Sequence, residues 1–187
     1  MNPMSLTSSS PKGLDPDVGV EALRRVLHGR RRLLVLTHKN PDPDSLGGAM
    51  GLQEFAKKVC GIDSDFAVTG RILRAENQTM VRELGIAMRR LDELDLSQYD
   101  CFALVDTQPG FGHTFVPPGI ELDIVIDHHL CEDGGDPGYE IGFLDVRTDV
   151  GATSSLVAYL LLQAGIEPSR EVATALAYGI KTDTADL

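Results

Sequence analysis

Three short apolar segments constrain the fold of this chain most strongly. Residues 33–36, 101–105 and 124–126 are continuously apolar, which is typical of strands that are buried on both faces of a parallel sheet. Stretches with the apolar spacing of helices lie before, between and after them. The alternation predicts an α/β fold, a mostly parallel sheet of about five strands with helices on both faces.

The same patterns predict the individual elements. Strands are expected at residues 33–36, 65–69, 101–105, 124–126 and 141–144, and helices at 18–28, 45–59, 76–84, 153–164 and 170–178. Residues 1–14 contain several Ser and Pro and lack the charged start and apolar stretch of a signal peptide, so we interpret them as a disordered leader. Residues 15–187 then form one domain. Because the chain ends shortly after a polar cluster, we expect it to be cut from a longer protein.

Composition excludes several classes of function. The formal net charge of -11 makes the domain a poor platform for long duplex nucleic acid, whose affinity comes mainly from cations that face phosphates. Three widely spaced cysteines without a CxxC pair fit a reducing cytoplasm better than a disulfide framework. No apolar run approaches the ~18 residues of a membrane span.

Acidic residues and histidines follow the predicted strands. The first strand runs into a loop with His38, Asp42 and Asp44, the third into Asp106, and the fourth into residues 127–129, an Asp-His-His triplet. In open parallel sheets, ligands bind beyond the carboxyl ends of the strands. A further polar cluster, residues 179–184 with Asp183, lies after the last predicted helix.

Each of these residues also has an ordinary structural interpretation. Asp44 could cap a helix, Asp106 could end a turn, and Asp183 could form an Asx turn. Two other histidines, His28 and His113, have the settings of a helix surface and a Gly/Pro loop. The combination of His and carboxylate groups at one sheet edge, without cysteine, nevertheless favours two divalent cations, with Mn²⁺ preferred and Mg²⁺ or Co²⁺ as alternatives.

Four ordered motifs carry a resemblance to a known family. They are His38-Lys-Asn-Pro-Asp42-Pro-Asp44-Ser-Leu-Gly, Val105-Asp106-Thr107, Asp127-His128-His129 and Gly179-Ile-Lys-Thr-Asp183-Thr. The sequence resembles the DHH phosphoesterases, in particular the RecJ-like exonucleases and the oligoribonuclease/phosphoadenosine-phosphate phosphatase branch. The resemblance implies the N-terminal DHH domain and the absence of a C-terminal substrate-binding domain.

The resemblance also implies roles for the motif residues. His38 and Asp42 would hold one ion, Asp44, His128 and Asp183 would hold the other, and Asp106 would bridge the two. His129 would be a catalytic group over the phosphoryl group, and Asp127 would be either a ligand or the residue that orients a histidine.

Candidate substrate contacts are less specific. Residues 151–155 are small residues at a predicted helix start, where the backbone N–H groups of Thr153, Ser154 and Ser155 could bind an anion or simply form a cap. Arg71, Arg74 and Arg147 are further candidate phosphate contacts.

These observations predict a two-metal phosphoester hydrolase that acts on short oligonucleotides or small nucleotides. The alternatives are a manganese-dependent inorganic pyrophosphatase and a non-catalytic nucleotide-binding or regulatory module. A phosphorylated small molecule or short oligonucleotide, and a second copy of the chain in a homodimer, are the partners considered.

Overall fold

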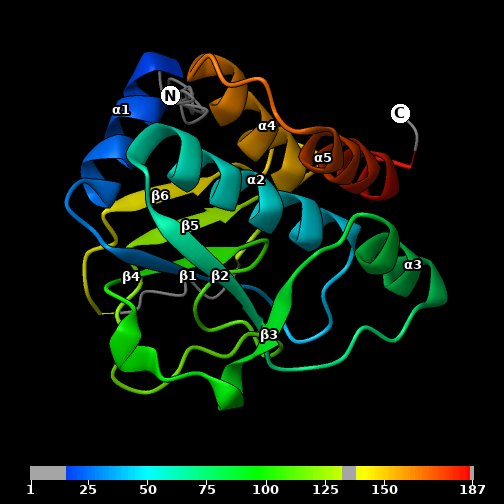
Figure 1. The fold of residues 1–187 in the computed structure, drawn as a ribbon, viewed down its shortest axis with the longest axis horizontal. Helices are drawn as coiled ribbons and strands as arrows, with labels where there is room; N and C mark the ends of the chain where they lie inside the picture. The colour runs from blue at the N-terminus through cyan, green and yellow to red at the C-terminus, as the bar shows by residue number, and fades with distance from the viewer. Residues whose placement is uncertain (1–15, 132–137, 186–187) are drawn as a thin grey trace, which may run out of the picture.

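The computed structural model describes residues 16–131 and 138–185. Its centre is a six-stranded sheet in the order β3-β2-β1-β4-β5-β6, and every neighbouring pair is parallel (Figure 1). The strands are β1 (Arg32–Leu36), β2 (Asp63–Val68), β3 (Met88–Arg90), β4 (Cys101–Val105), β5 (Ile124–Asp127) and β6 (Phe143–Val146). The predicted α/β class is confirmed. The predicted leader, residues 1–14, lies outside the described residues.

Five α-helices and two short 3-10 helices accompany the sheet. They are α1 (Pro16–Leu27), α2 (Pro43–Cys60), α3 (Ala75–Glu83), α4 (Thr153–Gln163) and α5 (Arg170–Asp183), with η1 (Leu91–Glu93) and η2 (Leu96–Gln98) before β4. None of the helices in the described part of the chain is long and apolar enough to cross a membrane.

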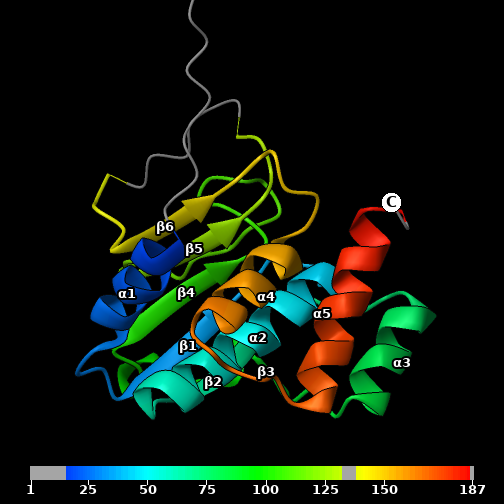
Figure 2. The same cartoon turned by 90° about the horizontal axis from the view of Figure 1, so that it is seen from above.

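The order of the strands decides which face each connection covers. The chain moves from β1 to β2 to β3 in one direction and then from β3 to β4, β5 and β6 in the other. Right-handed crossovers place the connections of these two series on opposite faces. The α-helices accordingly share one core with Leu33 and Val35 of β1, and all five appear on the same side of the sheet in Figure 2. Leu34 and Leu36 point to the second face, which η1, η2 and loops cover.

Several details differ from the sequence prediction. The sheet has six strands instead of about five, and its α-helices lie on one face instead of both, because the connections of β4, β5 and β6 on the other face are loops and two short 3-10 helices. β2 spans 63–68 instead of 65–69. β3 was not predicted, because the strand is only three residues long, Met88–Arg90, and two of the three are charged. β6 begins at Phe143 instead of 141. Helix α5 continues to Asp183, so the polar cluster of residues 179–184 does not follow the helix as predicted but forms its last turns.

The position of the site follows from this topology. β1 and β4 are neighbours, yet the chain leaves them toward opposite edges of the sheet. Such a switch point opens a crevice at the carboxyl ends of the two strands, where ligands bind in open parallel sheets. The residues that follow β1 and β4 here include His38 and Asp106.

Candidate metal centre

Three strand ends and one helix end bring the predicted ligands together. One group of potential ligand atoms comes from His38, Asp42 and Asp106, and within it all atoms lie within 4.8 Å of one another. A second group, under the same limit, comes from Asp44, His128 and Asp183. The two groups have the same members as the two ligand sets that the family resemblance implied, with Asp106 in the first.

Asp106 lies between the two groups. One of its carboxylate oxygens, Oδ2, is 3.6 Å from Nε2 of His38, and the other, Oδ1, is 3.7 Å from Nε2 of His128. The Thr153 hydroxyl donates a 2.9 Å hydrogen bond to Oδ1. The backbone of Asp106 has a φ of 62°, a left-handed conformation that Asp and Asn tolerate better than most residues. This geometry suits a carboxylate that bridges two ions.

Asp44 is completely buried, and the N-terminus of α4 holds it in place. The backbone N–H groups of Thr153 and Ser154 each donate a 2.7 Å hydrogen bond to its carboxylate. The positive end of the helix dipole favours a negative charge at this point. The backbone N–H groups predicted to bind a substrate anion are therefore neither exposed nor free, because the anion that they bind is Asp44. Ser155 is partly buried one residue further along, and its N–H group bonds to the Ala152 carbonyl.

Asp42 combines a structural and a site role. It is the N-cap of α2, where its carboxylate accepts a 3.1 Å hydrogen bond from the Ser45 N–H, and the Ser45 hydroxyl accepts one from the Asp42 N–H. The same oxygen lies 3.9 Å from Nε2 of His38. The helix cap, considered at Asp44 from the sequence, is therefore a capping box of Asp42 and Ser45.

His128 provides a test of whether the site fits a cation. Its Nε2 atom is buried and has no hydrogen-bond partner among the described residues. It lies 3.3 Å from Asp183, 3.6 Å from Asp44 and 3.7 Å from Asp106. Buried polar atoms are normally satisfied, so an exception that faces three carboxylates needs an explanation. A divalent cation held by these His and carboxylate groups supplies one.

The electrostatics of the cluster support the same conclusion. Burial opposes the charged form of His38, but the Asp106 and Asp42 carboxylates raise its pKa to about 9. For His128, burial likewise opposes the charge, and Asp183, Asp106 and Asp44 raise its pKa to about 9. Burial and the Asp106 charge raise the pKa of Asp44 to about 7. Without cations the cluster must therefore retain protons to offset its negative charge.

The sequence of the chain matches the model of the DHH family, N-terminal domain, over residues 32–180. The chain belongs to this family. The match includes every residue of the two groups except Asp183.

Known proteins extend the comparison. An uncharacterized protein of Methanocaldococcus jannaschii is 43% identical over 152 residues, which cover 81% of this chain and 30% of that protein. A probable manganese-dependent inorganic pyrophosphatase of Streptococcus suis is 26% identical over 157 residues, 82% of this chain and 48% of that protein. The chain therefore spans less than half the length of either relative.

A solved structure shows the same fold. An exopolyphosphatase-related protein from Bacteroides fragilis superposes with a TM-score of 0.67 at 17% sequence identity, over 90% of this chain and 50% of that chain. At this identity the likeness supports the fold and nothing more specific.

The three residues of the Asp-His-His motif have different positions in the centre. Asp127 is completely buried, and its Oδ1 lies 2.8 Å from Nδ1 of His129. Its Oδ2 accepts a 2.7 Å hydrogen bond from Gln108, which also donates to the His129 carbonyl. Asp127 belongs to neither ion group, so the geometry favours the orienting role over the ligand role. Asp127 also raises the pKa of His129.

The His129 ring lies at the mouth of the centre. Its side chain is half exposed, and its Nδ1 atom is 3.9 Å from Oδ1 of Asp106. It forms a third potential ligand group with Asp106 and His128. The position is open enough for contact with a substrate, as the family resemblance implied.

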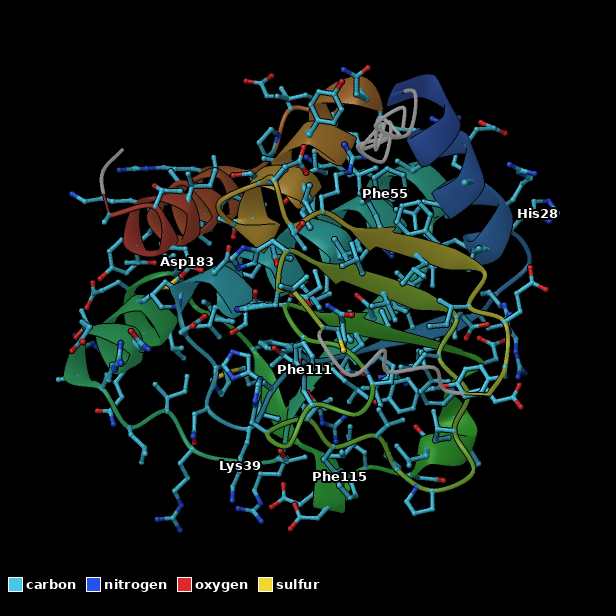
Figure 3. All side chains as sticks on the ribbon, turned by 180° about the vertical axis from the view of Figure 1, so that it is seen from behind. His28, Lys39, Phe55, Phe111, Phe115 and Asp183 are labelled. Atoms are coloured by element: carbon cyan, nitrogen blue, oxygen red, sulfur yellow. The ribbon has the colours of Figure 1, made fainter. Side chains whose placement is uncertain are left out.

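Close packing of two helices sets the position of Asp183. Figure 3 shows Asp183 at the end of α5, beside the start of α2. A Cβ atom added at Gly179 would lie only 2.9 Å from the Asp44 Cα and from the Pro43 carbonyl oxygen. Glycine at this position therefore permits the approach that brings Asp183 within 3.3 Å of His128.

The side chains of the three candidate arginines make no contact with the potential ion ligands among the described residues. Arg147 is engaged in a two-point ion pair with Asp145, with Nε 2.6 Å from Oδ1. Arg71 and Arg74 are exposed, and Arg74 is the residue that precedes α3. The backbone N–H of Arg147 donates a 3.0 Å hydrogen bond to the Asp127 carbonyl, but within the described ranges no side-chain hydrogen bond or ion pair joins any of the three arginines to the potential ion ligands.

Sequence reasoning missed two residues of the site. Gln108, which fixes Asp127 and His129, follows Asp106 by two residues, and its place beyond a strand end was a usable signal. His113, predicted to be an ordinary loop histidine, has its ring centroid 5.6 Å from that of His38. Nothing in its sequence setting indicated this.

Proposed function

We propose that this chain is the catalytic domain of a divalent-cation-dependent phosphoester hydrolase that acts on short oligonucleotides or small nucleotides. The observation that carries the proposal is the buried Nε2 atom of His128, which has three carboxylates around it and no hydrogen-bond partner among the described residues. Two ligand groups support a two-ion site: one contains Asp106, and Asp106 also lies 3.7 Å from His128 of the other. Membership of the DHH family supports phosphoester chemistry.

Mn²⁺ is the proposed ion, and Mg²⁺ or Co²⁺ suits the same oxygen and imidazole donors. The relative from Streptococcus suis is described as a probable manganese-dependent enzyme, which favours this choice. When bound, two such cations supply Lewis-acid activation of water and of the phosphoryl group and offset its negative charge.

The residues of the chain itself orient the reaction. One side of the centre consists of His38, Asp42 and Asp106. The other side consists of Asp44, His128 and Asp183. The buried Asp127 fixes the His129 ring through Nδ1 and favours its protonated form. A protonated His129 at the open side can donate a charge-assisted hydrogen bond to a phosphoryl oxygen.

The second candidate is a manganese-dependent inorganic pyrophosphatase. The observation that favours it is the 26% identity to the probable pyrophosphatase of Streptococcus suis. Both candidates use the same ion ligands, so the ligand set does not distinguish them. A non-catalytic nucleotide-binding module is the third, and the complete set of ligand positions argues against it.

Turnover assays with Mn²⁺ separate the three functions. Mononucleotide release from a dinucleotide supports the first, phosphate release from pyrophosphate alone supports the second, and nucleotide binding without turnover supports the third. His129→Ala should abolish most of the activity, because it removes the group at the open side. His28→Ala is a matched control. His28 is exposed, follows α1 directly and lies away from the sheet edge that holds the centre. Equal losses in both variants would contradict the proposal.

The proposed partner is a phosphorylated small molecule or short oligonucleotide. The -11 net charge argues against long duplex nucleic acid as a partner of this domain alone, which stays a prediction. A homodimer and a cytoplasmic location stay predictions.

A further inference from the structure

The loop after β4 brings an aromatic ring to the open side of the metal centre. The Phe111 ring is edge-on to the His129 ring, with centroids 6.4 Å apart and planes at 86°. It also lies 5.6 Å from the His113 ring, which is 5.6 Å from the ring of the ion ligand His38. Phe111 is therefore next to the group proposed to contact the phosphoryl oxygen, and its side chain is partly exposed.

Several contacts hold this loop in one position. Gln108 bonds to Asp127 and to the His129 carbonyl, at 2.7 and 2.8 Å. The Phe111 carbonyl accepts a 2.9 Å hydrogen bond from the Thr114 N–H. The loop is also joined to the segment after β1, because the Lys39 N–H donates a 2.9 Å hydrogen bond to the His113 carbonyl. A ring on a loop fixed in this way has its position set before a ligand arrives.

The Phe111 ring offers an apolar face beside the rings of His113 and His129. Leu130, which follows His129 directly in the chain, is a further apolar side chain and is 69% exposed. Among the described residues, a Cβ atom added at Gly112 would meet no heavy atom within 4 Å. Inorganic pyrophosphate has no apolar surface and gains nothing from contact with an aromatic face. A planar base does, since aromatic side chains stack on any base.

We propose that Phe111 is a specificity-determining residue whose ring stacks on the nucleobase of a nucleotide that has its phosphoryl group at the metal centre. The inference rests on the proposed function and narrows it to substrates that carry a base. Because stacking tolerates every base, the preference is for nucleotides over inorganic phosphates and not for one base over another.

The chain contains no tryptophan, which permits a direct optical test. Phe111→Trp introduces a single fluorophore at the proposed stacking position. Phe115→Trp is the matched control: Phe115 lies in the same loop and is 50% exposed, but among the described residues it has no ring contact with a site histidine (Figure 3). Each Mn²⁺-loaded variant is titrated with adenosine 5′-monophosphate, uridine 5′-monophosphate and pyrophosphate.

The expected result is saturable quenching at position 111 by both mononucleotides, with no comparable change on addition of pyrophosphate or at position 115. Absence of quenching at position 111, or equal quenching at both positions, overturns the inference. Calorimetric titration of the unmodified chain with the same mononucleotides distinguishes failure of the role of Phe111 from failure of the proposed function. Nucleotide binding and dinucleotide turnover without quenching overturn only the role of Phe111, whereas turnover of pyrophosphate alone overturns the proposed function as well.

Substitution of the ring gives a second measurement. Phe111→Ala should weaken mononucleotide binding by roughly 5- to 150-fold, the range of one lost base–aromatic stack. Phe111→Tyr should retain most of it, because the aromatic face is kept. Mn²⁺ and pyrophosphate affinities, measured by calorimetry, should stay within about twofold in both variants. A parallel loss of Mn²⁺ or pyrophosphate affinity in Phe111→Ala would show a structural role and contradict the inference.

Discussion

Replacement of Asp106 by Asn tests the arrangement of the metal centre directly. Asn has almost the same shape, tolerates the φ of 62° and can still accept the hydrogen bond from the Thr153 hydroxyl. The change removes one negative charge from a position 3.6 Å from His38 and 3.7 Å from His128. We expect the fold to survive and the binding of both ions to weaken.

The magnitude follows from the number of ligands lost. Structural zinc sites with four ligands bind with about 10–16 kcal/mol, which is about 2.5–4 kcal/mol per ligand. If Asp106 bridges the two ions, each of them loses a charged ligand, and each affinity should fall by at least ~60-fold. Calorimetric titration of metal-free protein with Mn²⁺ measures both affinities.

Asp145→Asn is the matched control. Asp145 is 4% exposed and lies on β6 of the same sheet, but its partner is Arg147 and it belongs to none of the potential ligand groups. Its Mn²⁺ affinities should equal those of the unmodified chain. Loss of one ion alone in Asp106→Asn would refute the bridging position, and retention of both would refute the assignment of Asp106 as a ligand.

Three further outcomes are expected. Asp127→Asn should lower turnover by roughly 10- to 100-fold while two Mn²⁺ ions still bind, because it affects only the orientation of His129; kinetics and calorimetry on one sample check this, and loss of an ion would make Asp127 a ligand. Gly179→Ala should destabilise the fold by about 1–3 kcal/mol in urea titrations, since the added methyl group has no space between α2 and α5, and an unchanged midpoint would contradict that packing. The pKa values of His38 and His128 rise from 6.5 to about 9 on folding, so they stabilise metal-free protein fully below pH 6.5 and lose this contribution as the pH rises through 9. The Tm of metal-free protein should fall across that interval and that of the Mn²⁺-loaded protein should not, as scanning calorimetry can show.

The proximity of the candidate ion ligands could be predicted from the sequence because their positions depend on short-range patterns. A buried parallel strand is recognisable as a continuous apolar run, and all such strands end at the same edge of the sheet. Residues directly after the runs, such as Asp106 and His128, must then lie close together without knowledge of the remaining contacts. The structure places both within one cluster.

The supporting residues could not be predicted, because their roles depend on contacts between distant segments. The backbone of Ser154 bonds to Asp44, 110 residues away in the chain, and its sequence suited a free anion site equally well. Gly179 looked like part of a loop after a helix. It lies inside α5. Glycine is required there because α5 packs closely against α2, and no turn is involved. Such distinctions need the packing of two helices, which local patterns do not contain.

Other parts of the fold hold the buried carboxyl groups of the centre in position. Burial of Asp44 and Asp106 is unfavourable, and it raises the pKa of both carboxyl groups. Two backbone N–H groups at the start of α4 hold Asp44, and the Thr153 hydroxyl holds Asp106. The start of α4, which the sequence suggested as a binding site for a substrate anion, therefore binds the candidate ion ligands Asp44 and Asp106 instead. In the proposed function, substrate phosphate would then be held by the ions and by groups at the open side, such as His129, and Phe111 lies beside His129.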